Sequence, residues 1–94
     1  MRSMDKVNSN IEFSSSQLAT PVILDLTGLQ CPLPVLKARR QIGQMLAGAV
    51  LVVMADDPAS PLDFDHFCHS SGHQLLESTE KNGIYIMRIS KAAE

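Results

Sequence analysis

The stretch PVILDLTGLQCPLPVLKARRQIGQMLAGAVLVVM, residues 21–54, changes its hydrophobic period twice. Val, Ile and Leu cluster from Val22 to Leu26, and a proline and a Thr-Gly pair bound this run, which predicts a short strand. From about Pro32 to Met45 the apolar residues fall instead in one stripe of a helix. From Ala49 to Met54 every residue is apolar, as in a buried or central strand. A strand, a helix and a strand in this order predict a right-handed parallel crossover.

The second half of the chain adds one helix and a hairpin to this unit. A helix is expected from Ser60, a residue type that caps helix N-termini, to about Ser71, where Gly72 ends it. Two further strands, about Gln74–Glu80 and Ile84–Ile89, are joined by an Asn-Gly pair that suits a type I′ turn. The order β-α-β-α-β-β predicts an α/β fold, a two-layer α/β sandwich with a four-stranded mixed sheet and two helices on one face.

The chain of 94 residues has room for one domain. Its first 20 residues are rich in Ser and Asn and carry apolar residues without a period, which predicts a disordered N-terminal tail at residues 1–20. The folded domain is therefore expected at residues 21–91. A body of about 75 residues has a small core, so we expect its chemistry on the surface rather than in an enclosed cavity.

Composition limits the compartment and the partners. Two cysteines do not make a disulfide framework, and the N-terminus has no apolar stretch of the kind a signal peptide needs. No run approaches the roughly 20 apolar residues that span a bilayer. We therefore expect a soluble, cytoplasmic protein with reduced thiols and no membrane contact. The net charge of -2 argues against bulk nucleic-acid binding, and no direct nucleic-acid binding is expected.

Cys31 occupies the position where α/β sheets place their chemistry, just after the first strand and at the start of the first helix. The unpaired N–H groups and the dipole of that helix end favour a thiolate over a thiol. Pro32, expected at the first helical position, starts the helix directly behind the sulfur, and Pro34 stiffens its first turn. Gly28 permits a tight approach from strand to helix. With no acidic residue nearby in the sequence, these features predict a reactive thiolate, against the alternative of a small buried side chain.

The surroundings of Cys31 exclude two common kinds of thiol chemistry. A dithiol oxidoreductase would have a second cysteine where this chain has Pro34. A hydrolytic cysteine enzyme would need a base and an oxyanion hole in a cleft that so small a chain cannot enclose. What remains is an exposed thiolate that attacks or carries a group delivered by a partner, and a sulfur atom held as a persulfide fits this role.

The blocks LDLTGLQCPLPVLKARR, VLVVMADDPAS and FCHSSGHQL follow one another with a spacing that resembles the TusA family of small sulfur-carrier proteins, also described as SirA/TusA-like. The family signature is a C-P-x-P motif at the start of the first helix, and the likeness covers about Leu24 to Ile89. Leu33 departs from the Glu or Met that the family often has at the variable position of the motif. This position lies beside the thiol, where a partner would meet it.

The resemblance implies a function as well as a fold. Cys31 would accept sulfane sulfur as a persulfide from a cysteine desulfurase and relay it to an acceptor protein, ultimately for 2-thiolation of the wobble uridine during tRNA processing. Related proteins act in sulfur oxidation or in molybdenum-cofactor sulfur supply. The pyridoxal phosphate belongs to the donor, so no cofactor is expected on this chain, which would be a transferase only as a persulfide relay. The alternatives are a regulatory binding module of the same fold and a thiol redox sensor.

Two other groups of charged residues have candidate roles. Lys37 and Arg40 form a possible docking patch for acidic surfaces of the sulfur donor or acceptor, whereas Arg39 borders the apolar stripe and would lay its stem along it. Asp56 and its neighbour Asp57 read first as turn formers before a proline. Asp56 is also expected to shape the wall near the thiol, as the matching block of the family suggests.

Three histidines and the second cysteine raise the question of a metal site. His66, His69 and His73 are spaced to share one helix face, but Gly72 should end the helix before His73. Cys68 falls on the opposite, apolar side of the helix and is expected to be a buried core thiol. We therefore expect no metal here.

Overall fold

The computed structural model describes residues 20–93 of the chain. The predicted disordered tail, residues 1–20, lies outside this part except for its last residue. The elements follow in the predicted order: β1 (Val22–Asp25), α2 (Leu33–Gly43), β2 (Val50–Ala55), α3 (Ser60–Ser71), β3 (Gln74–Lys81) and β4 (Ile84–Ser90). No helix within residues 20–93 has both the length and the apolar character to cross a membrane.

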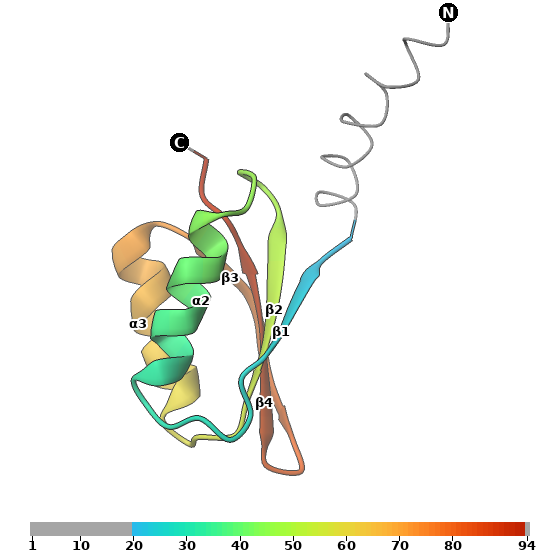
Figure 1. The fold of residues 1–94 in the computed structure, drawn as a ribbon, viewed down its shortest axis with the longest axis vertical. Helices are drawn as coiled ribbons and strands as arrows, with labels where there is room; N and C mark the ends of the chain where they lie inside the picture. Colours follow the sequence, from blue (N-terminus) through green and yellow to red (C-terminus); the bar gives the residue numbers. More distant parts are fainter. Residues whose placement is uncertain (1–19, 94) are drawn as a thin grey trace, which may run out of the picture.

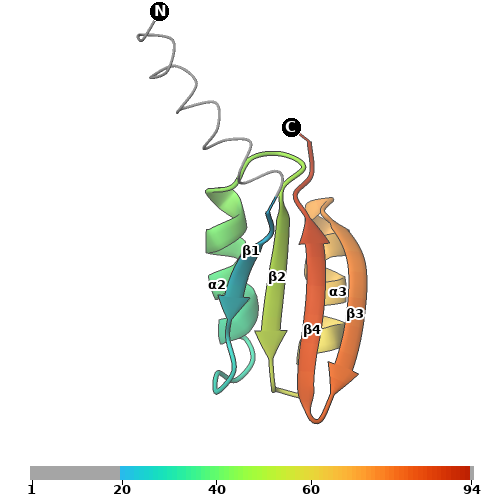
Figure 2. The ribbon, with the colours of Figure 1, turned by 90° about the vertical axis from the view of Figure 1, so that its right-hand side faces the viewer.

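The four strands form one mixed sheet in the order β1-β2-β4-β3. β1 pairs with β2 in parallel, while β4 is antiparallel to both β2 and β3. Both helices cover one face of the sheet (Figure 1), and no other described element covers the opposite face (Figure 2). The predicted two-layer α/β sandwich is confirmed.

The core lies between the helices and the sheet. Alternate residues of the central strand β2, Leu51 and Val53, are fully buried, as are Met87 and Ile89 of the neighbouring β4. These side chains cluster with Phe64 of α3, which has no exposed surface either. The period of two in the strands therefore selects which side chains meet the helices.

The hairpin and the end of α3 use the turn chemistry that the sequence predicts. Asn82 and Gly83, between β3 and β4, both have positive φ, 54° and 82°, as a type I′ turn requires. Gly72 ends α3 in the left-handed conformation, with φ of 82°, and its N–H donates to the carbonyl of Cys68. Glycine fits these positions because it has no Cβ to clash in the left-handed region.

α3 begins at Ser60 as predicted, but the predicted first residue of α2 and the predicted cap of α3 need correction. Pro32 is the N-cap of α2 rather than its first helical residue, because the chain still turns there: the N–H of Leu33 donates to the carbonyl of Gln30. The side chain of Ser60 caps nothing, since it is buried and its Oγ has no hydrogen-bond partner among the described residues. Asp57 holds the turn that leads into α3, because its Oδ1 accepts the N–H of Ala59 at 2.9 Å and its carbonyl accepts that of Ser60.

Candidate functional site

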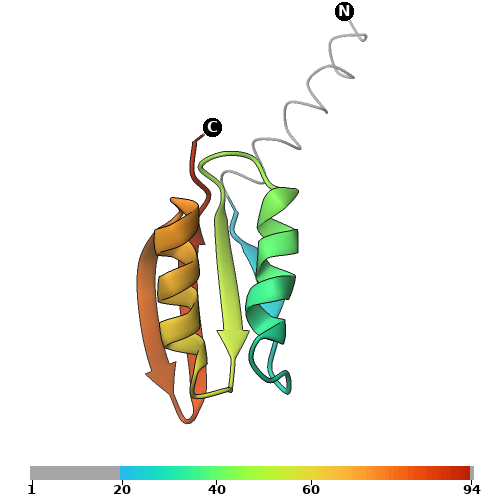
Figure 3. The ribbon, with the colours of Figure 1, turned by 90° about the vertical axis from the view of Figure 1, so that its left-hand side faces the viewer.

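Cys31 is an exposed free thiol in the loop between β1 and α2. The two helices run in the same direction, so the amino ends of α2 and α3 lie at the same end of the molecule (Figure 3). The loops that lead into both helices meet at this end, and Cys31 lies in one of them. The predicted position of the thiol at a helix start is therefore correct, and a second helix start lies beside it.

Two consecutive aspartates hold the loop that carries Cys31. Both carboxylate oxygens of Asp56 lie 3.1 Å from the backbone N of Gly28, and Oδ2 of Asp57 accepts the N–H of Cys31 at 2.6 Å. The hydrogen bond from Cys31 is the main reason why the pKa of Asp57 is lowered. Asp56 thus fixes the start of the loop rather than touching the thiol. Asp57, which the sequence suggested only as a turn former, holds the backbone of Cys31 itself.

Gly28 is required for its backbone conformation and not for space. Its φ is 88°, in the left-handed region, yet no atom lies within 4 Å of where a Cβ would stand. The prediction that Gly28 is needed for a close approach of strand and helix is therefore wrong, and the residue is needed for its positive φ. The positive φ turns the chain at Gly28, and the N–H of the same residue donates to Asp56.

Gly28→Ala should lower the free energy of unfolding by about 1–2 kcal/mol, the cost of a Cβ in the left-handed region. Denaturant unfolding followed by circular dichroism measures the change. Gly43→Ala is the matched control, because Gly43 lies in α2 with equal space around it and without the positive φ. That variant should be as stable as the wild type or slightly more stable. Equal destabilisation by both substitutions would contradict the backbone explanation.

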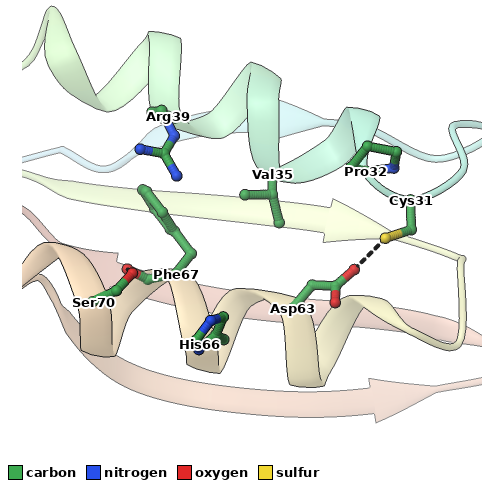
Figure 4. Close-up of a pocket in the computed structure, with 8 residues that line it drawn as sticks. All are labelled: Cys31, Pro32, Val35, Arg39, Asp63, His66, Phe67 and Ser70. Carbon is green, nitrogen blue, oxygen red and sulfur yellow. Dashed lines mark hydrogen bonds between the residues drawn. The ribbon is translucent and has the colours of Figure 1, made fainter.

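The side chain of Cys31 contacts an acidic residue that the sequence analysis did not assign to the site. Sγ donates a hydrogen bond to Oδ2 of Asp63, in the first turn of α3 (Figure 4). The two residues are 32 positions apart. The order of the elements could have predicted this contact. In a β-α-β-α unit the amino ends of both helices lie at one end of the sheet, and Asp63 lies in the first turn of the second helix.

The pKa of the Cys31 thiol is raised above its ordinary value. The largest cause is the hydrogen bond to Asp63, followed by desolvation and by the negative charges of Asp63 and Asp57. Each of these disfavours the thiolate. The expectation that no acid lies near Cys31 is wrong, and in the free protein the two aspartates oppose the helix dipoles that would favour a thiolate.

A groove of about 270 Å³ begins at Cys31 and runs between the two helices. Val35 and Arg39 line it from α2, and Asp63 and Phe67 line it from α3. The guanidinium carbon of Arg39 lies 5.1 Å from the centroid of the Phe67 ring, a distance that suits a cation–π contact. Arg39 thus covers Phe67, as its predicted apolar border position suggests, and its charge faces the groove.

The sequence of this chain is similar to those of known proteins. The family model described as sulfurtransferase TusA matches residues 22–91. The chain belongs to the TusA family. It is 45% identical to the sulfur carrier protein TusA of Allochromatium vinosum over 69 residues, which cover 73% of this chain and 91% of the relative. It is 42% identical to the TusA of Pseudomonas putida strain W619 over 72 residues, or 77% of this chain and 90% of the relative.

A solved structure agrees with this assignment to the TusA family. The SirA-like protein of Desulfitobacterium hafniense superposes with a TM-score of 0.69 at 28% identity, over 77% of this chain and 99% of that one. In this TusA-family chain the C-P-x-P motif reads Cys31-Pro-Leu-Pro, and the variable Leu33 is 46% exposed. An apolar side chain therefore stands on the surface close to the thiol, where the family often has Glu or Met.

The predicted docking residues lie away from the groove. Lys37 and Arg40 line a separate shallow hollow on the other side of α2, together with Leu24, Gln41 and Gln44. Their role as a docking patch stays a prediction. Arg39, for which the sequence analysis expected only packing, is the basic residue of α2 that lines the same groove as Cys31.

The histidines and the second cysteine lie in different surroundings, and His66 lines the groove that begins at Cys31. His73 lies beyond the end of α3, and its Nδ1 accepts the N–H of Ala92 at 2.9 Å. Cys68 is buried as predicted, and burial, with a smaller effect of Asp65, raises the pKa of its thiol to about 11. Within residues 20–93 no three His, Cys, Asp or Glu side chains are grouped so that they could hold a metal ion.

Proposed function

We propose that this protein is a sulfur carrier in which Cys31 accepts sulfane sulfur as a persulfide from a cysteine desulfurase and passes it to an acceptor protein. The observation that carries the proposal is the exposed Cys31 of a C-P-x-P motif, held where two helix starts meet, in a TusA-family chain. An exposed thiol in a loop at one end of the molecule can enter the site of a partner, which suits a group that is handed from protein to protein.

Each transfer is a thiol exchange in which atoms and electrons balance. The thiolate of Cys31 attacks the terminal sulfur of the donor persulfide, the S–S bond of the donor breaks, and the donor cysteine leaves as a thiolate. The proton of Cys31 ends on the donor, so a donor persulfide and a Cys31 thiol become a donor thiol and a Cys31 persulfide. Delivery to the acceptor repeats the exchange in the opposite sense.

The other site residues support this step without reacting. Gly28 and Asp56 fix the start of the loop, and Asp57 holds the backbone N–H of Cys31. Pro34 lies in the first turn of α2, where its missing N–H costs no helix hydrogen bond. Pro32 caps that helix directly behind the sulfur.

The family resemblance supports a proposal for the destination of the sulfur. Thiolation of the wobble uridine in tRNA is the proposed end product, and transfer takes place in the cytoplasm between Cys31 and protein cysteines. The carrier itself needs no cofactor and no contact with nucleic acid, because the pyridoxal phosphate belongs to the donor. Lys37 and Arg40 would meet acidic surfaces of these partner proteins.

A role as a thiol redox sensor gains no support from the site. Sensor cysteines combine exposure with a low pKa, because the thiolate is the form that oxidants attack. Cys31 is exposed, but its hydrogen bond to Asp63 raises its pKa. The carrier function fits better, since a partner protein supplies both the sulfur and a new environment for the thiol.

Incubation of the full chain with a pyridoxal phosphate-dependent cysteine desulfurase and cysteine should add the mass of one sulfur atom to the protein. Intact-mass spectrometry detects the gain, and a thiol reductant should reverse it because a persulfide is reducible. Sulfide release by the desulfurase on its own serves as the control for donor activity. An active desulfurase that leaves the mass of this protein unchanged would contradict the proposed function.

A further inference from the structure

The groove that starts at Cys31 extends well past the thiol. Figure 4 shows Cys31 and Asp63 at one end, Arg39 at the other, and Val35 and Phe67 along the way. The transfer of sulfur needs only the first of these positions. The rest of the groove is not needed for the transfer step itself. Its length and its charges indicate which ligand it binds.

The length of the groove corresponds to a few residues of extended chain. Arg39 follows Leu33, the first residue of α2, by six residues, or about 9 Å at 1.5 Å per residue of helix, and Cys31 lies in the loop just before that helix. An extended peptide advances about 3.3–3.6 Å per residue, so three or four residues cover the distance from Cys31 to Arg39. A peptide whose cysteine lies over Cys31 would place its third or fourth neighbour at Arg39.

The charges at the two ends of the groove are opposite. Asp63 makes the thiol end acidic, whereas Arg39 stacks on Phe67 and leaves the edge of its guanidinium without a carboxylate partner among residues 20–93. An arginine held flat on an aromatic ring keeps its planar fork of donors available for a carboxylate. Between the ends, Val35 and Phe67 offer an apolar surface to an intervening side chain. His66 and Ser70 add polar groups on the α3 side.

We propose that this groove binds an extended acidic segment of the partner protein, with the partner's reactive cysteine at Cys31 and a carboxylate three or four residues away on Arg39. The proposal rests on the proposed function only in that a partner cysteine must reach Cys31. It adds a requirement on the partner's sequence near that cysteine. A basic residue at the same distance would meet Arg39 with a like charge and bind less well.

Matched synthetic peptides test this without any sulfur donor. Each peptide carries one cysteine activated as a mixed disulfide with thionitrobenzoate, and Asp or Lys at both the third and fourth positions after the cysteine, or at both the third and fourth positions before it. The Cys31 thiolate attacks the peptide sulfur, the disulfide bond breaks, and coloured thionitrobenzoate leaves as a thiolate. At low salt, in one of the two placements, the Asp peptide should react about two- to fivefold faster than its Lys counterpart, the range of an exposed ion pair.

Three variants assign that preference to Arg39. Arg39→Gln should remove it, Arg39→Lys should keep part of it because the charge stays and the fork is lost, and added salt should weaken it in the wild type. Lys81→Gln is the control for net charge, since Lys81 is the last residue of the edge strand β3 and does not line the groove, and it should keep the preference. Circular dichroism checks that each variant is folded.

The proposal is overturned if neither placement gives a preference in the wild type. It is also overturned if Arg39→Gln keeps the preference, or if Lys81→Gln loses it to the same extent. An activated disulfide of free cysteine, which cannot reach Arg39, should react equally with the wild type and Arg39→Gln. Because the assay uses no desulfurase, failure here leaves sulfur loading of Cys31 unaffected, and failure of loading would leave this result standing.

Discussion

Cys31→Ser should abolish the gain of one sulfur atom that a cysteine desulfurase and cysteine give the wild type. A serine hydroxyl is not ionised at neutral pH and cannot form a persulfide, so both the nucleophile and the carrier atom are lost. The fold should not change, because Cys31 is exposed and its backbone N–H still reaches Asp57. Intact-mass spectrometry of both proteins, treated side by side, measures the effect.

Cys68→Ala is the matched control for this loss. Cys68 is buried in the core with a pKa of about 11, so it offers neither access nor thiolate to a donor. The variant should gain one sulfur atom as the wild type does. Loading that survives in Cys31→Ser and disappears in Cys68→Ala would place the sulfur on the wrong residue for the proposed function.

The Cys31→Ser variant also distinguishes a sulfur carrier from a regulatory binding module. Calorimetric titration should show that Cys31→Ser still binds the desulfurase, since the docking surfaces remain. If the wild type binds the desulfurase and never takes up sulfur, the fold serves as a binding module and Cys31 is not a carrier.

The fold could be predicted because its elements differ in hydrophobic period. The apolar run at Ala49–Met54 becomes the central strand β2, and the Asn82-Gly83 turn gives the hairpin its register. Element ends were less predictable, because they depend on caps from other parts of the chain. Ser60 is a common N-cap residue, yet its side chain is buried, and the side chain of Asp57 accepts the N–H of Ala59 just before the helix.

The site was predictable only in part for a similar reason. The position of Cys31 follows from local sequence, since the strand end, the prolines and the helix start are all within a few residues. Its electrostatic environment is set by Asp57 and Asp63, which come from a different loop and helix. The local sequence predicts the helix start next to Cys31. It does not predict that Asp63, from the next helix, contacts the thiol. The sequence analysis likewise expected only packing from Arg39, because the contact that holds its guanidinium comes from Phe67 on α3.

Asp63→Asn should lower the pKa of the Cys31 thiol and raise its rate of alkylation at neutral pH severalfold. In the wild type the hydrogen bond and the charge of Asp63 stabilise the protonated thiol, so the thiolate forms only at higher pH. Asparagine keeps the shape and loses the charge. The thiol then faces the amino ends of α2 and α3 with one negative charge fewer, and its pH profile should shift to lower pH.

The pH profile also distinguishes a change in proton affinity from a change in access. A thiolate of lower pKa is intrinsically less nucleophilic, so at alkaline pH, where both thiols are ionised, the wild type should react as fast as the variant or faster. The two curves of alkylation rate against pH should therefore converge or cross. A rate that rises by the same factor at every pH would show instead that Asp63 only shields the sulfur.

Asp65→Asn is the matched control for Asp63→Asn. It is measured against Cys68→Ala as the parent protein, because Asp65 also raises the pKa of Cys68. Asp65 lies on the same helix and carries the same charge, but it is not among the groups that raise the pKa of Cys31. Its removal should leave the alkylation profile of Cys31 close to that of the parent. If Asp65→Asn shifts the profile as far as Asp63→Asn does, the overall charge of α3 sets the thiol's pKa, and the direct hydrogen bond from Cys31 to Asp63 is not the cause.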